Sequence, residues 1–224
     1  MKRISLKYSA VTLILLLLIG GIYFLTSWPQ GQETIGRIVN APIYRGDHHA
    51  VLCVILDDGT EQEMLDALQR EGLSVTFFLT QSAVSNPVVL GKIKEMSGEF
   101  AVAGPGQDSG EACAALAEVR IFLKEQGLSA APYYMPLSEL RREVADLVAR
   151  EGLSVVQCGI DSLDTRLEDS SRIAAAVLRN LRQGAFVQMH GYARTAKALA
   201  DIADGAVLLG VDFGTVSSAL KQGL

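Results

Sequence analysis

Two adjacent carboxylates, Asp57 and Asp58, directly follow an apolar run at positions 51–56. Six apolar residues in a row, Val and Ile among them, predict a strand that is buried on both faces. Two acids at the end of such a strand repel each other and lose hydration, so packing alone explains them poorly. Paired acids in this position commonly bind a cation, or one acts as a base while the other is a ligand. The chain has only three histidines, so a histidine-rich metal site is difficult to assemble.

Other polar residues follow predicted strands in the same way. Asp108 follows the third predicted strand, Asp161 and Asp164 follow the fifth, and His190 ends the sixth. Because the carboxyl ends of parallel strands open onto one face of an α/β fold, these side chains should converge there. We therefore expect one acidic site with a single imidazole. The alternative is that these are ordinary polar loops, and Asp108 could equally cap the helix that follows it.

The elements that would position these residues are apolar strand-like runs that alternate with helical segments. Strict alternation predicts a parallel sheet with helical crossovers. Seven such units could close into a barrel or remain an open, doubly wound sheet, and periodicity alone does not choose between them. The strands are expected at 51–56, 75–79, 100–103, 132–134, 154–160, 185–189 and 207–211, and the helices near 61–71, 86–97, 110–126, 138–150, 170–182, 193–204 and 214–222.

The N-terminus has the pattern of a membrane anchor. Three basic residues precede an uncharged segment at 9–25, whose length is at the short limit for crossing a bilayer. No small-x-small cleavage site follows it, which favours an uncleaved signal anchor over a cleaved signal peptide. The basic flank predicts a cytoplasmic N-terminus and an extracytoplasmic C-terminal domain at the cell membrane. We expect an anchor at 1–28, a linker at 29–48 and a folded domain at 49–224.

Charge and cysteine content exclude some partners. Without the three basic residues of the flank, 17 basic residues face 25 acidic ones, so the outer domain is acidic. This balance argues against nucleic acid or anionic lipid as a partner. The three cysteines are odd in number and lack metal-type spacing, so a complete disulfide framework is not expected. Cys53 and Cys158 lie in apolar runs, where a buried free thiol is the default interpretation.

Five segments, in this order, resemble motifs of the polysaccharide deacetylase family, whose shared unit is the NodB homology domain. Each motif alone is weak, but five in the right order are fairly specific. The resemblance implies a single α/β domain of seven βα units in a distorted barrel, here preceded by one transmembrane helix. The segments are Ile-Leu-Asp-Asp-Gly at 55–59, Val-Thr-Phe-Phe-Leu at 75–79, 159–164, 184–190 and 210–217.

The resemblance also implies roles for individual residues. In this family a divalent metal such as zinc activates a water that attacks the acetyl group of a sugar. Asp57 would be the base and Asp58 a metal ligand, while His190 would protonate the leaving amine and Asp161 would raise its pKa and fix its tautomer. Tyr133 and Tyr134 lie where the wall of the substrate groove begins, where one of them would stack on sugar rings.

The departures from the family pattern concern the metal. The family's pair of histidine ligands is replaced by Gly104 and Asp108, so two oxygen ligands, Asp58 and Asp108, would have to hold a weakly bound cation or none. His48 and His49 precede the first strand, at the opposite end of the sheet. We therefore expect an impaired or inactive deacetylase-like protein that acts on or binds a peptidoglycan-like cell-wall glycan. The alternatives are an active deacetylase with a rebuilt metal site, and an unrelated α/β binding domain.

Overall fold

The computed structural model describes residues 41–58, 61–85, 95–96 and 98–220. From Pro42 onward the chain forms one unit, separate from residues 1–41. Within the described ranges, no helix is both long and apolar enough to cross a bilayer. The anchor predicted at 9–25 lies outside the described residues.

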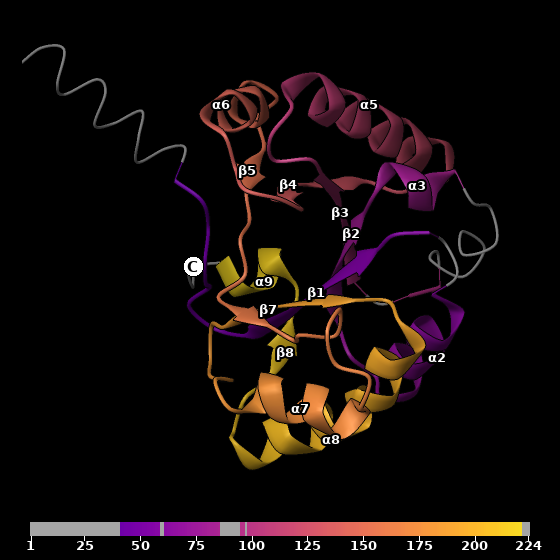
Figure 1. The fold of residues 1–224 in the computed structure, drawn as a ribbon, viewed down its shortest axis with the longest axis vertical. Helices are drawn as coiled ribbons and strands as arrows, with labels where there is room; N and C mark the ends of the chain where they lie inside the picture. The colour runs from indigo at the N-terminus through magenta and orange to yellow at the C-terminus, as the bar shows by residue number, and fades with distance from the viewer. Residues whose placement is uncertain (1–40, 59–60, 86–94, 97, 221–224) are drawn as a thin grey trace, which may run out of the picture. The chain divides into compact units, whose positions relative to one another are not determined.

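A curled parallel sheet forms the centre of the unit (Figure 1). Its strand order is β5-β4-β3-β2-β1-β7-β6, and the short β8 also pairs with β1. The strands are β1 (Ala50–Leu56), β2 (Val75–Leu79), β3 (Gly98–Gly104), β4 (Ala130–Pro136), β5 (Ser154–Val155), β6 (Ile160–Asp161), β7 (Phe186–His190) and β8 (Phe213–Gly214). The predicted parallel sheet is confirmed. It is a curled sheet with two separate edges, β5 and β6, and not a fully paired barrel.

Helices cover the convex face of the sheet. They are α2 (Gln62–Arg70), α3 (Gln81–Val84), α5 (Ser109–Glu125), α6 (Arg142–Arg150), α7 (Ser170–Leu178), α8 (Ala193–Leu208) and, on the other side, α9 (Val216–Leu220). The short α3 was not predicted, and the helix expected at 86–97 falls almost entirely outside the described residues.

Two predicted strands were wrong. The run at 154–160 is not one strand, because β5 pairs with β4 at one edge of the sheet and β6 pairs with β7 at the other. Residues 156–159 cross between these edges, and Val156 donates its amide to Tyr134 O at 2.8 Å. Of the strand expected at 207–211, residues 207 and 208 end α8 and the other three form the turn that follows it. The closing strand is β8, which pairs with β1 at Ala50 and Val51.

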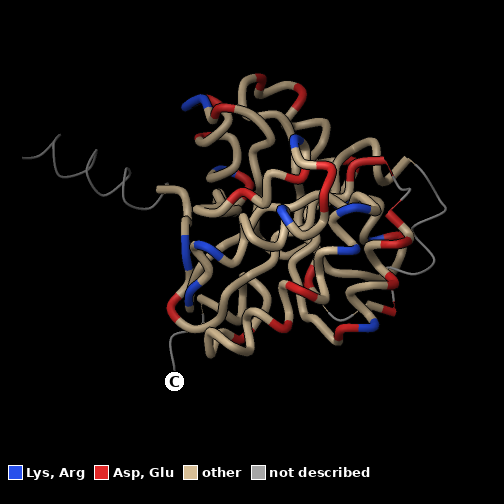
Figure 2. The backbone as a smooth tube through the Cα atoms, turned by 60° about the horizontal axis from the view of Figure 1, so that its bottom comes forward, with Lys and Arg blue, Asp and Glu red and all other residues tan. Residues whose placement is uncertain are grey.

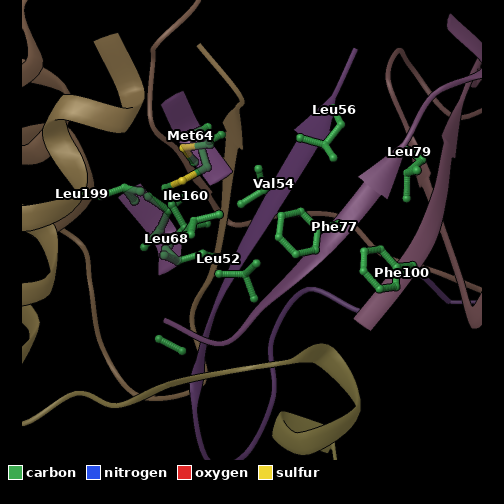
Figure 3. Close-up of a cluster of buried hydrophobic side chains, with 14 of the residues drawn as sticks. Leu52, Val54, Leu56, Met64, Leu68, Phe77, Leu79, Phe100, Ile160 and Leu199 are labelled. Carbon is green, nitrogen blue, oxygen red and sulfur yellow. The ribbon is translucent and has the colours of Figure 1, made fainter. Parts of the chain in front are cut away.

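Side chains of β1 alternate between two apolar clusters, as the period of a strand requires. Leu52, Val54 and Leu56 pack toward the helices, where Phe77 and Phe100 stack with ring centroids 5.4 Å apart (Figure 3). Val51, Cys53 and Ile55 face the concave side. Every residue of β1 is buried, so this central strand is a rigid support for the residues that follow it.

The C-terminal helix α9 covers the concave cluster. Val216 donates its amide to Thr76 Oγ1 at 2.9 Å, and Ser217 donates its amide to Glu99 Oε1 at 3.0 Å. Thr76 Oγ1 itself donates to Glu99 Oε1 at 2.8 Å. These bonds satisfy helix N-terminal amides that would otherwise lack partners. The hollow of the curled sheet is thereby filled by the chain's own C-terminal segment.

Acidic and basic residues are interspersed along the described backbone (Figure 2). The excess of acid is therefore distributed over many elements, and the candidate site is distinguished by how its acids are placed and not by their number.

Candidate functional site

Asp57 and His190 meet at the carboxyl ends of two neighbouring strands. Parallel pairing of β1 with β7 aligns Ile55 with His190, and the amide of Gly191 donates to Ile55 O at 3.0 Å. The Nε2 atom of His190 lies 3.9 Å from Oδ2 of Asp57. The Asp57 side chain is 37% exposed and the His190 side chain 15%, so both reach the surface of the site. The predicted convergence of these two residues is confirmed.

Asp164 is the carboxylate that holds His190. Its Oδ1 lies 3.0 Å from His190 Nδ1, and its Oδ2 accepts from the backbone N–H of His190 at 2.6 Å. Oδ2 also accepts from Thr195 Oγ1 at 3.0 Å. The Asp164 residue is fully buried, so these partners satisfy a charge that would otherwise be costly to bury. The bond to Nδ1 fixes the ring orientation and leaves Nε2 facing Asp57.

The predicted pairing of His190 with Asp161 was wrong. Asp161 ends β6 and is exposed, and its Oδ1 accepts from the amide of Leu163 at 2.8 Å. Leu163 has a φ of 60°, which is unusual for a residue with a large side chain. The tight turn at Leu163 brings Asp164, which is three residues after Asp161, within hydrogen-bonding distance of the His190 imidazole. Asp161 acts on His190 only as a more distant charge.

The electrostatics suit an acid–base pair. Burial alone would lower the pKa of His190, but the hydrogen bond and charge of Asp164, with the charges of Asp57 and Asp161, raise it above its ordinary value. Burial raises the pKa of Asp57, and Asp58 and Asp164 add to the effect, while His190 opposes it. The pKa of Asp164 is lowered, because its hydrogen bonds outweigh its burial. Both Asp57 and His190 therefore hold a proton to a higher pH than the free side chains do.

Glu61 was missed by sequence reasoning, although it supports the acidic pair. It occupies the N-cap position of α2 and is 5% exposed. Its Oε1 accepts from the amide of Asp57 at 2.6 Å and from the amide of Asp58 at 3.1 Å. Gly191 permits this arrangement, since a Cβ there would overlap the side chain of Glu61. No sequence signal distinguished Glu61 from the other acids that begin helices.

A stack of three side chains extends the site beyond His190. The Tyr192 ring lies 5.2 Å from the imidazole at an interplanar angle of 9°, and the guanidinium of Arg194 lies 4.5 Å from the Tyr192 centroid. Arg194 Nε donates to Asp164 O at 2.7 Å, so the stack is tied to the turn that carries Asp164. Burial raises the pKa of Tyr192, and the nearby charge of Asp57 adds to it. The stack places aromatic surface and hydrogen-bonding groups beside the acids.

The two predicted metal ligands lie on exposed segments, and one of them caps a helix. Asp58 is exposed, and Asp108 is exposed and caps α5, accepting from the amides of Gly110 and Glu111 at 2.7 and 3.0 Å. A Cβ at Gly104 would lie 2.5 Å from Tyr134 Oη. This position therefore has neither a donor nor room for one. Over the residues that the structure describes, no group of three His, Cys, Asp or Glu could hold a metal ion. The donor set does not fit the family's zinc ion.

One of the two tyrosines was expected to pack inward and the other to stack on sugar, but both are buried. Tyr134 is fully buried, and its hydroxyl donates to Pro105 O at 2.8 Å. Tyr133 is 8% exposed and faces the concave cluster, where its hydroxyl shares a hydrogen bond of 3.1 Å with Ser217 Oγ. Because α9 fills the concave side, neither ring is open to a ligand.

Comparisons with known proteins agree with this architecture. No family model matches the chain. The chain is 25% identical over 202 residues to YlxY, an uncharacterized protein of Bacillus subtilis, and the match covers 81% of this chain and 61% of YlxY. The chain thus spans about three fifths of the length of this curated relative.

Solved structures give a stronger likeness of fold. BA3943 of Bacillus anthracis, a CE4 family pseudoenzyme, superposes with a TM-score of 0.73 at 20% identity, over 81% of this chain and 69% of that one. A BA3943 mutant with restored enzymatic activity gives 0.71 at 20% identity, over 81% and 72%. The Bc1960 peptidoglycan N-acetylglucosamine deacetylase gives 0.70 at 19% identity, over 80% and 92%. The TM-scores establish a likeness of fold, and at such low sequence identities the comparison extends to the fold alone.

Proposed function

We propose that this chain, which has the fold of the polysaccharide deacetylases of carbohydrate esterase family 4, binds an acetylated, peptidoglycan-like glycan without metal-dependent hydrolysis. The observation that carries the proposal is the placement of His190, which Asp164 holds so that its Nε2 faces Asp57. Among the described residues, no group of three His, Cys, Asp or Glu that could hold a metal ion lies beside it, which supports the proposal. Similarity to a pseudoenzyme and to a peptidoglycan deacetylase supports it.

The site offers groups that suit a sugar. Asp57 accepts hydrogen bonds, and His190 Nε2 donates one when the ring is protonated or carries its proton there. The raised pKa of His190 favours the protonated form, which would bind a hydroxyl or acetyl oxygen by a charge-assisted hydrogen bond. Tyr192 adds an aromatic edge beside them. These residues would orient an acetylated sugar at the carboxyl end of the sheet.

The membrane-anchored location is part of the proposal. The uncharged segment 9–25 and its basic flank would tether the domain to the extracytoplasmic side of the cell membrane. A domain tethered there is within reach of a cell-wall polysaccharide.

A second candidate is an active deacetylase with a rebuilt metal site. The observation that favours it is the acid–base pair, since Asp57 and His190 both have raised pKa values and are 3.9 Å apart. Such a pair could accept and return a proton in acyl transfer. It would still need a group that polarises the acetyl carbonyl.

The two candidates are separated by titrating the full-length protein with N-acetylglucosamine oligosaccharides while released acetate is measured. The proposal expects saturable binding, with no acetate released before or after loading with zinc, cobalt, manganese or nickel. Asp57→Asn and His190→Gln should weaken binding, while Asp201→Asn, an exposed change on α8, should not. Metal-dependent acetate release would establish the second candidate, and absence of binding in every condition would refute both.

A further inference from the structure

A basic groove runs along the edge strand β6. Two hollows of about 300 and 390 Å³ adjoin this strand, and they are continuous because Asn180 lines both. The first lies beside Asp161, at the carboxyl end of β6, and the second lies beside Gly159 and Ile160. Since β6 is an edge of the sheet, no further strand of the described chain covers it. We call this surface the edge groove, and its lining includes four arginines, Arg45, Arg172, Arg179 and Arg182.

The four arginines are exposed and keep their charge available. Within the described ranges, none of them forms an ion pair with a carboxylate. Arg182 Nη1 donates instead to the backbone oxygen of Asn180 at 3.3 Å, which places this guanidinium next to the residue that joins the two hollows.

Two acids belong to the same segment, but both accept hydrogen bonds from the backbone. Asp161 Oδ1 accepts from the amide of Leu163 at 2.8 Å. Asp169 Oδ1 accepts from the amides of Ser171 and Arg172 at 2.8 and 3.4 Å, and so caps α7. These acids offset part of the positive charge, and four cations against two leave the edge groove basic.

A basic groove is unexpected in a chain with 25 acidic and 20 basic residues. All four cations are arginine, whose planar fork binds a carboxylate through two parallel hydrogen bonds. Complementary charge of this kind selects an anionic partner and fixes its register. The edge groove is therefore suited to a ligand that presents carboxylates along its length.

The edge groove begins beside the candidate site. Asp161 pairs with Gln188 of β7, two residues before His190. From there the groove follows β6 back to Gly184 and Ala185, which precede β7. An extended polymer with one unit at His190 can therefore place its next units along the edge groove.

An aromatic ring at the far end of the groove suits a sugar. Tyr44 is 55% exposed and lines the second hollow together with Arg45. Its ring offers an apolar face on which a sugar ring can pack, beside a cation that can bind a carboxylate. Unlike Tyr133 and Tyr134, this tyrosine is open to a ligand.

We propose that the edge groove binds the carboxylates of an acidic glycan strand, one of whose acetylated sugars lies at His190. The inference rests on the proposed function for the sugar at His190 and adds the class of polymer, a glycan that carries carboxylates along its length. The arginines bind the carboxylates, and Tyr44 packs on a sugar ring. A neutral glycan leaves the guanidinium groups to water and binds more weakly.

The test compares two tetrasaccharides by calorimetric titration of the full-length protein. One alternates N-acetylglucosamine with N-acetylmuramic acid, and the other is the same molecule with its carboxylates reduced to alcohols. The acidic form should bind roughly four- to twentyfold more tightly, since each exposed ion pair contributes a factor of about two to five. The difference should shrink as the salt concentration rises.

Substitutions assign this preference to the groove. Arg172→Gln and Arg179→Gln, at exposed positions on α7 and at its C-cap, should each weaken binding of the acidic form about two- to fivefold. Neither should change binding of the neutral form. Arg150→Gln, at the exposed end of α6, is the charge-matched control and should change neither form. His190→Gln should weaken both forms by the same factor.

Equal affinity for the two tetrasaccharides would overturn the inference and leave the proposed function intact. A preference that survives in the double variant Arg172→Gln/Arg179→Gln would overturn it as well, and so would equally tight binding of polygalacturonate, which is acidic but not acetylated. Binding of the acidic form alone, lost in the arginine variants and unaffected by His190→Gln, would support the edge groove and refute the sugar site at His190. Binding of neither form would overturn both.

Discussion

Replacing Asp164 should uncouple His190 from the rest of the site. This buried carboxylate accepts from His190 Nδ1, the His190 amide and Thr195 Oγ1. In Asp164→Asn, the amide oxygen can still accept from the backbone N–H and the hydroxyl. The amide nitrogen then faces Nδ1 and donates to it, which forces the proton of neutral His190 onto Nε2. The fold should survive, whereas the His190 pKa should fall, because burial lowers it and the opposing carboxylate is gone.

The expected loss of folding free energy is larger for Asp164→Ala than for Asp164→Asn. Asp164→Ala leaves three donors without an acceptor and should cost about 3–5 kcal/mol of folding free energy. In a domain of this size that corresponds to roughly 6–20 °C in melting temperature. Asp164→Asn keeps the hydrogen bonds but loses the charge, and should cost about 1–2 kcal/mol. Thr195→Val, which removes a single donor, is a matched control with a smaller effect.

The assay is an NMR titration of the imidazole C–H signals of the three histidines, with His190 assigned from His190→Gln. Because the pKa of His190 is raised in the folded state, protonation of this residue stabilises the fold. This contribution to folding free energy is complete below pH 6.5, the ordinary histidine pKa, and is lost as the pH rises through the folded-state pKa. Wild type should therefore lose stability in that interval, and Asp164→Asn should not. An unchanged His190 pKa in Asp164→Asn would refute the assignment of Asp164 as its partner.

Three further predictions concern the surrounding residues. Because the pKa of Asp164 is lowered in the folded state, its ionised form stabilises wild type, and this contribution is lost as the pH falls below 3.8, the ordinary carboxyl pKa. The stability of wild type should therefore fall relative to that of Asp164→Asn in this range, as measured by urea unfolding at a series of pH values. Glu61→Ala should cost about 1–3 kcal/mol, since the amides of the two site aspartates lose their acceptor, whereas Glu61→Gln should be tolerated; equal stability of both variants would contradict this. Introducing histidines at positions 104 and 108 should not create a stoichiometric zinc site unless Tyr134→Phe is added, because the new Cβ at 104 would meet the tyrosine hydroxyl; elemental analysis after gel filtration would decide.

Part of the site followed from sequence because it depends on strand ends. Asp57 and His190 each end an apolar run, and parallel pairing brings such ends together. The choice between Asp161 and Asp164 could not be made in this way. Both follow the same strand, and the backbone turn at Leu163 decides which of them points inward.

The other misses also arose from tertiary context. Tyr133 and Tyr134 alternate along β4, so one was expected to be open, but α9 covers the concave face and both are buried. The apolar run at 207–211 resembles a strand, yet Val207 and Leu208 are 77% and 88% exposed at the end of α8. A local pattern does not record which surface another segment will cover.

The most direct test of glycan binding without a metal is calorimetric titration of the full-length, chelator-treated protein with an N-acetylglucosamine tetramer. The account predicts saturable binding that is unchanged when zinc is added back and is weakened by His190→Gln. Binding that appears only after metal is restored, or no binding heat at any protein concentration, would contradict it.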